Sequence, residues 1–249
     1  MMNQKFYRYI SFFGLSFLRE QNFQQLRMLE KDVYLFLKDL AIKNGADPKN
    51  IKSQIYQDIF VLYTLNWKRN GFFVEFGSTN GFDLSNSYLL EKDFGWKGIL
   101  CEPASVWKDD LKKNRNSILD FRCVWKTSGK TLDLIVPNKA EFSKISILKN
   151  QKSLNVDQSE KVETVSLIDL LNTHNAPKKI DYLSIDTEGS EYEILEAFDF
   201  SKYRISIITC EHNFSKEREK ILKLLNKNGY QRVFQGLSRW DDWYIKSYN

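Results

Sequence analysis

The first quarter of the chain has the hydrophobic spacing of helices. Between residues 23 and 43, apolar side chains recur at steps of three and four residues, which predicts an amphipathic helix ending near Asn44 and Gly45. A second helix is predicted over residues 55–67. It ends before Gly71, because glycine can take the left-handed conformation that closes helices.

From residue 72 onwards, short continuous apolar runs alternate with helix-like stretches. The runs predict strands at 72–76, 98–101, 118–125, 131–136, 180–185, 205–210, 231–234 and 243–245. Helices are predicted from directly after Gly81 to residue 93, after Pro103 up to residue 114, and from Thr164 to residue 171. Two more are predicted after Gly189 up to residue 198 and over residues 215–228. Continuous apolar strands are typical of parallel sheets with helices on both faces, so the fold class is α/β. The last two strands predict a hairpin, which would place one antiparallel strand at the end of the sheet.

Composition narrows the class of protein. The 249 residues are 42% hydrophobic and 28% charged, with a formal net charge of +5, which excludes disorder as the main state. The length fits one large α/β domain with an appendage, or two small domains. The positive charge is not clustered in the way that nucleic-acid binding requires, so no nucleic-acid partner is predicted.

Cysteine usage and the N-terminal apolar stretch bear on the compartment. The three cysteines form no CxxC pair and the chain has two histidines, so neither a zinc finger nor a disulfide framework is expected and a reducing, cytoplasmic compartment is predicted. The apolar residues 9–18 are too few for a bilayer span, which needs about 20. Arg19 and Glu20 follow where a signal peptide would have a small-residue cleavage site. The stretch is therefore interpreted as a docking segment, with no membrane span.

Candidate chemistry lies at the carboxyl ends of the strands, where α/β sheets bind ligands. The first strand leads through Glu75 and Gly77 to Gly81, and these glycines allow a ligand to approach a helix N-terminus. Thr79 stands where a dinucleotide fingerprint has its second glycine. The second strand ends in Glu102, and a carboxylate there can bind both ribose hydroxyls. Together they predict a nucleoside-containing ligand; the alternatives are an ordinary strand-to-helix turn and a solvated carboxylate.

A second polar group follows the strands predicted at 180–185 and 205–210. Asp186 and Glu188 come after one strand, and Glu211, His212 and Asn213 after the next. Their oxygen and nitrogen atoms suit a divalent ion such as Mg²⁺ or Mn²⁺. In a metal-free site, Glu188, Glu211 or His212 is the candidate general base, and His212 has the ordinary pKa nearest neutrality. Both alternatives make Asp186, Glu188, Glu211 and His212 the predicted catalytic residues.

Several blocks of sequence resemble one family. FFVEFGSTNGFDLSNSYLLEKDFGWKGILCEP, TVSLIDLL, IDYLSIDTEGSEYEIL and CEHN, with SQIYQD upstream, are similar to the FkbM-type family of S-adenosylmethionine-dependent methyltransferases. The resemblance covers roughly residues 53–245. It implies a Rossmann-like class I methyltransferase domain over residues 53–249, with a seven-stranded, mainly parallel sheet and a C-terminal antiparallel hairpin. Residues 1–52 lie outside it as an N-terminal helical segment.

The resemblance implies a cofactor, S-adenosylmethionine, and its binding residues. Glu75, Gly77 and Gly81 would hold the methionine part, Glu102 the ribose, and Cys123 and Val124 would lie at the adenine. The full implied set is Gln54, Gln57, Glu75, Gly77, Ser78, Gly81, Ser85, Glu102, Cys123, Val124 and Asp186. Asn80 departs from the family, which commonly has an acid there. Metal-dependent relatives imply Asp186 and Glu211, with His212 beside them, as ligands of Mn²⁺ or Mg²⁺.

The family typically methylates hydroxyls of sugars and other small natural products. The resemblance therefore implies O-methylation of a sugar or glycan precursor, of the surface-polysaccharide or natural-product type, with metal assistance left open. The N-terminal helices and the aromatic residues 240–244 would cover the acceptor. The alternatives are a nicotinamide-dependent oxidoreductase and a non-catalytic nucleotide-binding protein. The oligomeric state is open and includes a homodimer.

Overall fold

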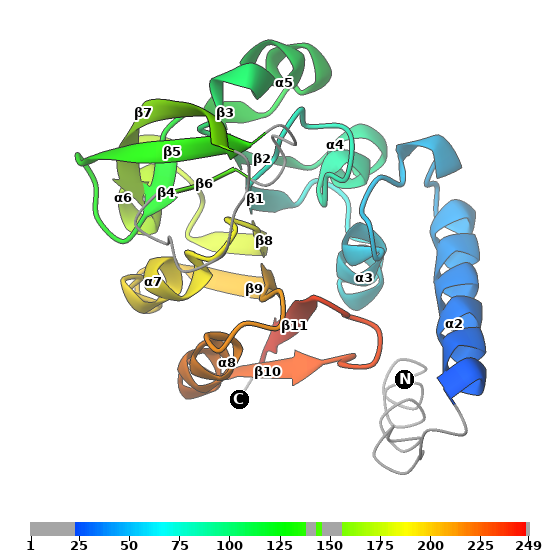
Figure 1. The fold of residues 1–249 in the computed structure, drawn as a ribbon. Coiled ribbons are helices and arrows are strands. Elements are labelled where there is room, and N and C mark those ends of the chain that lie inside the picture. The colour runs from blue at the N-terminus through cyan, green and yellow to red at the C-terminus, as the bar shows by residue number, and fades with distance from the viewer. Residues whose placement is uncertain (1–22, 138–142, 146–155, 248–249) are drawn as a thin grey trace.

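The computed structural model describes residues 23–137, 143–145 and 156–247 (Figure 1). Within them, seven strands form one sheet in the order β10-β11-β9-β8-β1-β2-β3. These strands are β1 (Phe72–Phe76), β2 (Lys97–Cys101), β3 (Ile118–Asp120), β8 (Lys179–Ile185), β9 (Arg204–Glu211), β10 (Tyr230–Val233) and β11 (Asp241–Lys246). The pairs among β9, β8, β1, β2 and β3 are parallel, and β11 pairs antiparallel with both β9 and β10. The predicted α/β fold with a mainly parallel seven-stranded sheet and a terminal hairpin is confirmed.

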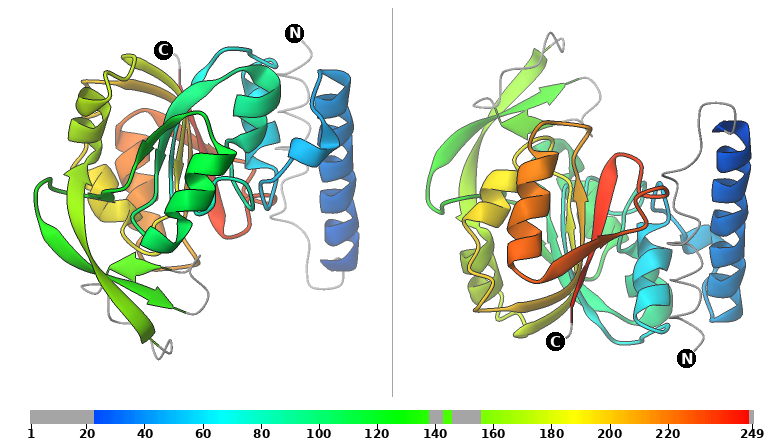
Figure 2. Two further views of the ribbon diagram at one scale, coloured as in Figure 1. Left: turned by 90° about the horizontal axis from the view of Figure 1, so that it is seen from above. Right: turned by 90° about the horizontal axis from the view of Figure 1, so that it is seen from below.

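Helices cover both faces of this sheet (Figure 2). The helices are α2 (Phe23–Lys43), α3 (Gln57–Thr64), α4 (Tyr88–Phe94), α5 (Lys108–Asn114), α6 (Leu167–Thr173), α7 (Glu191–Glu196) and α8 (Arg218–Lys227), with 3₁₀ turns η3 (Pro48–Asn50) and η4 (Ser105–Trp107). Phe73 packs into the core on the α2, α3 and α4 side, whereas Val74 packs into the core on the α6, α7 and α8 side. Successive side chains of a strand point to opposite faces, so the continuous apolar run of β1 serves both cores.

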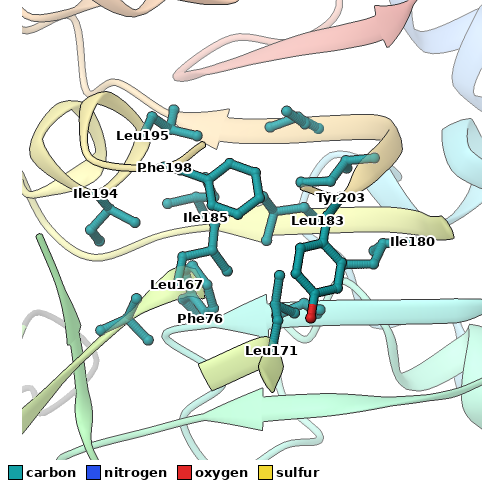
Figure 3. Close-up of a cluster of buried hydrophobic side chains, with 14 of the residues drawn as sticks. Phe76, Leu167, Leu171, Ile180, Leu183, Ile185, Ile194, Leu195, Phe198 and Tyr203 are labelled. Carbon is teal, nitrogen blue, oxygen red and sulfur yellow. The ribbon is translucent and has the colours of Figure 1, made fainter. Parts of the chain in front are cut away.

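The core beneath α6 and α7 fixes the strand ends that lead to the site (Figure 3). Leu183 and Ile185 of β8 contact side chains from both helices in one buried cluster. Phe76, the last residue of β1, belongs to the same cluster and is 1% exposed. The carboxyl ends of β1 and β8 are therefore held side by side by apolar burial.

A second, four-stranded sheet lies beside the first, in the order β4-β7-β5-β6. Its strands are β4 (Cys123–Trp125), β5 (Thr131–Pro137), β6 (Lys144–Ile145) and β7 (Val156–Ser166). Figure 2 shows β5 and β7 projecting from the body of the molecule. Leu134, Ile145 and Val162 of this sheet form a small core with Cys123 and Trp125. Residues of this sheet, among them Leu134 and Ile145, line the cavity described below.

Four local predictions are wrong. The strand predicted over residues 118–125 is two strands, β3 and β4, which belong to different sheets. Residues 164–166 belong to strand β7, and helix α6 begins after Ser166, whose hydroxyl accepts the Asp169 N–H as an N-cap. The helix expected directly after Gly81 begins at Tyr88. The antiparallel strand β11 is not at the edge of the sheet, because it inserts between β9 and β10.

The N-terminal helix prediction is confirmed by α2, whose buried residues Tyr34, Leu37 and Ala41 face the core around α3. The predicted second helix is shorter, since α3 covers Gln57–Thr64. No helix in the described part of the chain is long and apolar enough to cross a membrane. The docking segment predicted at residues 9–18 lies outside the described residues.

Candidate active site

A cavity of about 450 Å³ opens at the carboxyl ends of β1, β2, β8 and β9. The strand order therefore brings residues from four separate parts of the chain to one place, as α/β topology requires. The predicted site residues in its walls are Gln54, Gln57, Glu75, Gly77, Ser78, Ser85, Glu102, Cys123, Val124, Asp186, Glu188 and Glu211. Gly81 and His212 are not in its walls.

Glu75 is a buried carboxylate in the β1 strand, 3% exposed. Its oxygens accept hydrogen bonds from the Asn86 N–H at 2.7 Å, from the Ser85 hydroxyl at 3.1 Å and from the Ser87 hydroxyl. The Arg115 guanidinium lies 3.9 Å away and shares the same two serines. These donors fix the carboxylate in one orientation toward the cavity.

The turn after β1 needs glycine at its first position. Gly77 has φ +69°, and a Cβ there would lie 2.0 Å from the carbonyl oxygen of Asp186. The backbone of β1 therefore passes against the end of β8 at a distance that no side chain permits. Gly81, also at positive φ, lies behind this turn, where its carbonyl accepts a hydrogen bond from Arg115 Nη1 at 3.1 Å. Gly81 shapes the turn and does not line the cavity.

Glu102 marks the second strand end, as predicted. Its two oxygens accept the N–H groups of Thr79 and Ala104, each at 2.9 Å. Burial raises the pKa of Glu102 to about 7, against the effect of these two hydrogen bonds. Beyond it, Cys123 and Val124 form an apolar end of the cavity with Leu134 and Ile145 of the second sheet.

Three carboxylates meet where β8 and β9 end. Oxygen atoms of Asp186, Glu188 and Glu211 all lie within 4.8 Å of one another. Asp186 and Glu211 are hydrogen-bonded to each other, and burial together with this crowding raises the pKa of both. Glu188 has a left-handed backbone, φ 57°. Such a cluster retains a proton or takes a cation, because adjacent carboxylates in a buried site cannot all remain ionised alone.

The structure does not bring His212 into this cluster, which corrects the prediction of His212 as a catalytic residue and metal ligand. Its Nδ1 accepts the Phe214 N–H at 2.9 Å, so Nε2 carries the proton and donates to the Asp241 carbonyl at 3.1 Å. Burial lowers the pKa of His212. Both ring nitrogens are engaged by backbone, and neither is free to bind a metal or accept a substrate proton.

Several polar residues of the cavity were not predicted from the sequence, among them Asp241 and Asn86. Asp241 is 5% exposed and pairs across strands with Glu211, because the register of β11 against β9 places them opposite each other. Gln57 Nε2 donates to Asp241 Oδ2 at 2.8 Å. Asn86 lies in the wall with its Oδ1 buried and without a hydrogen-bond partner. The predicted last strand, 243–245, began two residues too late, because β11 starts at Asp241 and the hairpin brings this end next to the end of β9.

A sheet of this order with a polar cavity at its carboxyl edge defines the Rossmann-like methyltransferase class of fold. The family model described as the methyltransferase FkbM domain matches residues 75–232, and the chain belongs to this family. It is therefore an S-adenosylmethionine-dependent methyltransferase, which decides against the oxidoreductase and the non-catalytic alternatives.

Solved structures with a detectable likeness are distant. Precorrin-6y C5,15-methyltransferase from Geobacter metallireducens is 14% identical, with 82% of this chain and 95% of that chain covered and a TM-score of 0.42. The O-methyltransferase from Bacillus cereus in complex with SAH is 12% identical, with 98% of both chains covered and a TM-score of 0.40. No curated protein matches significantly. Membership of the family rests on the domain match.

The cavity fits the cofactor that the family uses. S-adenosylmethionine carries an ammonium and a sulfonium, and the walls present the carboxylates of Glu75, Glu102 and Asp186. The unpartnered Oδ1 of Asn86 is a buried acceptor that a bound ammonium would satisfy. The apolar end at Val124 suits a purine ring. The donor set and the shape therefore agree with this cofactor.

Proposed function

We propose that this methyltransferase acts on a hydroxyl group of a sugar or glycan precursor, of the surface-polysaccharide or natural-product type. The observation that carries the proposal is the carboxylate cluster of Asp186, Glu188 and Glu211 beside the cofactor residues. A sugar hydroxyl is a very weak acid, so its methylation needs a group that removes or displaces the proton. Trp240, which lines the same cavity, supplies an aromatic face of the kind that packs on sugar rings.

Binding of the cofactor is divided among residues whose orientation is already fixed. Glu75 would accept from the ammonium of the methionine part, and Glu102 from the ribose hydroxyls. Gln54, Gln57, Gly77, Ser78 and Ser85 form the walls between these groups, and Cys123 and Val124 would enclose the adenine. The sulfonium of the bound cofactor supplies an electrophilic methyl group. The protein's main task is to hold the acceptor oxygen in line with it.

Two kinds of assistance suit the carboxylate cluster. As a base, one carboxylate would take the hydroxyl proton during attack, a contribution of roughly 10²–10⁴-fold. As ligands, Asp186, Glu188 and Glu211 would hold a divalent cation that lowers the pKa of the hydroxyl. Their all-oxygen set favours a hard ion such as Mg²⁺, with Mn²⁺ next, and Glu188 takes the place that was predicted for His212. The proposal includes either form.

The proposal also covers the compartment in which the enzyme acts. The free cysteines Cys101, Cys123 and Cys210 are all buried, which suits a reducing compartment, and we place the enzyme in the cytoplasm. Its oligomeric state is left open.

Thermal unfolding with ligands tests the cofactor and the metal together. S-adenosylmethionine and S-adenosylhomocysteine should each raise the Tm, because they bind the native state, whereas NAD⁺ should not. A further rise with Mg²⁺ or Mn²⁺ that EDTA reverses, and that Glu188→Gln removes, would favour the metal form. A parallel assay of methyl transfer to a panel of sugars tests the acceptor class. Methyl transfer to nitrogen or carbon acceptors alone would contradict the proposal.

A further inference from the structure

The walls of the cavity are acidic although the chain as a whole is basic. Its acidic wall residues are Glu75, Asp83, Glu102, Asp186, Glu188, Glu211 and Asp241. Among the described residues, no Lys, Arg or His lines the cavity, whereas the whole chain has a net charge of +5. Glu75 and Glu102 belong to the cofactor side. The other acids lie in the part of the cavity that is left for the acceptor.

Neither the cofactor nor the carboxylate cluster accounts for two carboxylates on this wall, Asp83 and Asp241. Asp83 is exposed and accepts a hydrogen bond from the Asn80 side-chain amide at 2.8 Å, whereas Asp241 is buried. Asp241 begins β11, is 5% exposed, and lies opposite Glu211 in the strand pairing. No ion pair joins it to a Lys, Arg or His of the described residues. An ionised carboxylate that is buried without a cation is costly, so a ligand that brings positive charge would favour the ionised form of Asp241.

The position of Asp241 is fixed from two sides. Gln57 donates from Nε2 to its side chain, and the same amide is oriented by the Ile55 N–H, which Gln57 Oε1 accepts at 3.2 Å. His212 donates from Nε2 to its carbonyl at 3.1 Å, and the His212 N–H binds the Trp240 carbonyl at 2.9 Å. The carboxylate and the neighbouring Trp240 are thus held in place before any ligand arrives, which lowers the cost of ordering them on binding.

We propose that Asp241 determines specificity by binding a protonated amine on the acceptor, so that the acceptor is an amine-bearing sugar and not a phosphorylated or carboxylated one. This rests on the sugar-hydroxyl function proposed above. Asp241 lacks a counter-ion whether or not a metal is bound. A divalent cation held by Asp186, Glu188 and Glu211 would offset the charge of that cluster alone. The indole of Trp240 adds a face that attracts cations.

Binding and turnover with matched acceptors test the inference. The probes are the methyl glycosides of glucosamine, N-acetylglucosamine and glucuronic acid, with binding measured by calorimetry in the presence of S-adenosylhomocysteine. The amine should bind roughly 10- to 100-fold tighter than its N-acetyl form, the usual range for a charge-assisted hydrogen bond, and the glucuronide should bind weakest. In Asp241→Asn this preference should disappear, while S-adenosylhomocysteine still binds. Asp110→Asn, a change of an exposed acid on α5, is the control and should keep the preference.

The outcomes separate the two proposals. Methyl transfer to neutral sugars without a preference for the amine would overturn the role of Asp241 and leave the sugar function in place. A preference for the amine in binding, with no sugar methylated, would overturn the sugar function and keep Asp241 as an amine site. Equal binding of all three probes without turnover would overturn both. If Asp241→Asn fails to fold, His212→Asn and Gln57→Ala should each weaken the preference, since both residues position Asp241.

Discussion

At the scale of single residues, Gly77 and Gly129 share a backbone conformation and differ in surroundings. Their φ angles are +69° and +71°, but a Cβ at Gly77 would lie 2.0 Å from the Asp186 carbonyl, whereas nothing lies within 4 Å at Gly129. Gly129→Ala should lower the free energy of unfolding by about 1 kcal/mol, the cost of a left-handed alanine. Gly77→Ala should cost several times more and weaken S-adenosylhomocysteine binding. Denaturant unfolding and ligand titration measure both, and equal losses in the two variants would contradict the close-approach account.

A second prediction for a single residue concerns the contribution of Glu102 to cofactor affinity. Both of its oxygens accept backbone N–H groups, so Glu102→Gln would set an amide NH₂ against one of these donors. We expect S-adenosylhomocysteine to bind roughly 10- to 100-fold more weakly, as for the loss of a hydrogen bond to a charged group. Glu163→Gln, an exposed change on β7, is the control and should leave the affinity unchanged. An unchanged dissociation constant in Glu102→Gln would show that this carboxylate does not bind the cofactor.

The positions of single residues explain why several residues of the candidate site could be predicted from the sequence and why the prediction for His212 was wrong. Glu75, Glu102, Asp186 and Glu211 lie at or next to strand ends, and the α/β pattern fixes where those ends meet. His212 follows Glu211 directly, and adjacent residues at a strand end point to opposite sides. The sequence places both at the edge of the sheet, but only the fold decides which one turns into the cavity.

At the scale of elements, α2 stabilises the domain through one side. Leu37 is 7% exposed and packs into the core that α3 and α4 share, whereas Leu35 on the same helix is 49% exposed. Leu37→Ala should lower the free energy of unfolding by about 2–5 kcal/mol. Leu35→Ala should change it by no more than about 0.5 kcal/mol. Comparable effects in urea unfolding would mean that α2 does not contribute to the core in solution.

Elements with strong local patterns could be predicted, and those set by distant pairing could not. The spacing of apolar residues suffices for α2, and the apolar runs suffice for β1, β8 and β9. Strand β7 covers Val156–Ser166 and carries four charged residues, at positions 157, 160, 161 and 163. Its pairing with β5 and β4 determines its conformation, although the residues at its end have helical spacing. The insertion of β11 between β9 and β10 likewise depends on pairing between residues that are distant in the sequence. Local sequence does not encode such partners.

At the scale of the whole molecule, burial of acids links stability to pH. Burial raises the pKa of Asp58, Glu102 and Asp241 to about 7, from ordinary values of 3.8 for Asp and 4.5 for Glu. The folded protein thus holds protons that the unfolded chain releases near pH 4. The stability that these neutral acids contribute is complete below about pH 4 and is lost as the pH rises through 7.

Other titratable groups stabilise the fold more as the pH rises, each over a different pH range. The pKa values of Glu91 and Asp120 are lowered, mainly by partners such as Arg115 and Arg122 against the effect of burial, so their contribution is lost only as the pH falls below about 4. Burial lowers the pKa of His212, so its neutral form stabilises the fold above its ordinary value of 6.5. Burial also raises the pKa of Asp186, Glu191 and Glu211. Between pH 5 and 8, one histidine therefore opposes several buried acids, and stability should fall as the pH rises.

The resulting prediction concerns the free enzyme and its cofactor complex. The Tm of the ligand-free protein should be lower at pH 8 than at pH 5 by several degrees, and Asp58→Asn should flatten this dependence because its side chain carries no charge at either pH. S-adenosylmethionine should raise the Tm more at pH 8 than at pH 5, since its positive groups favour the ionised carboxylates of the cavity. Calorimetric scans at both pH values measure these shifts. A Tm that rises with pH in the ligand-free protein would contradict the raised pKa values of Asp58, Glu102 and Asp241.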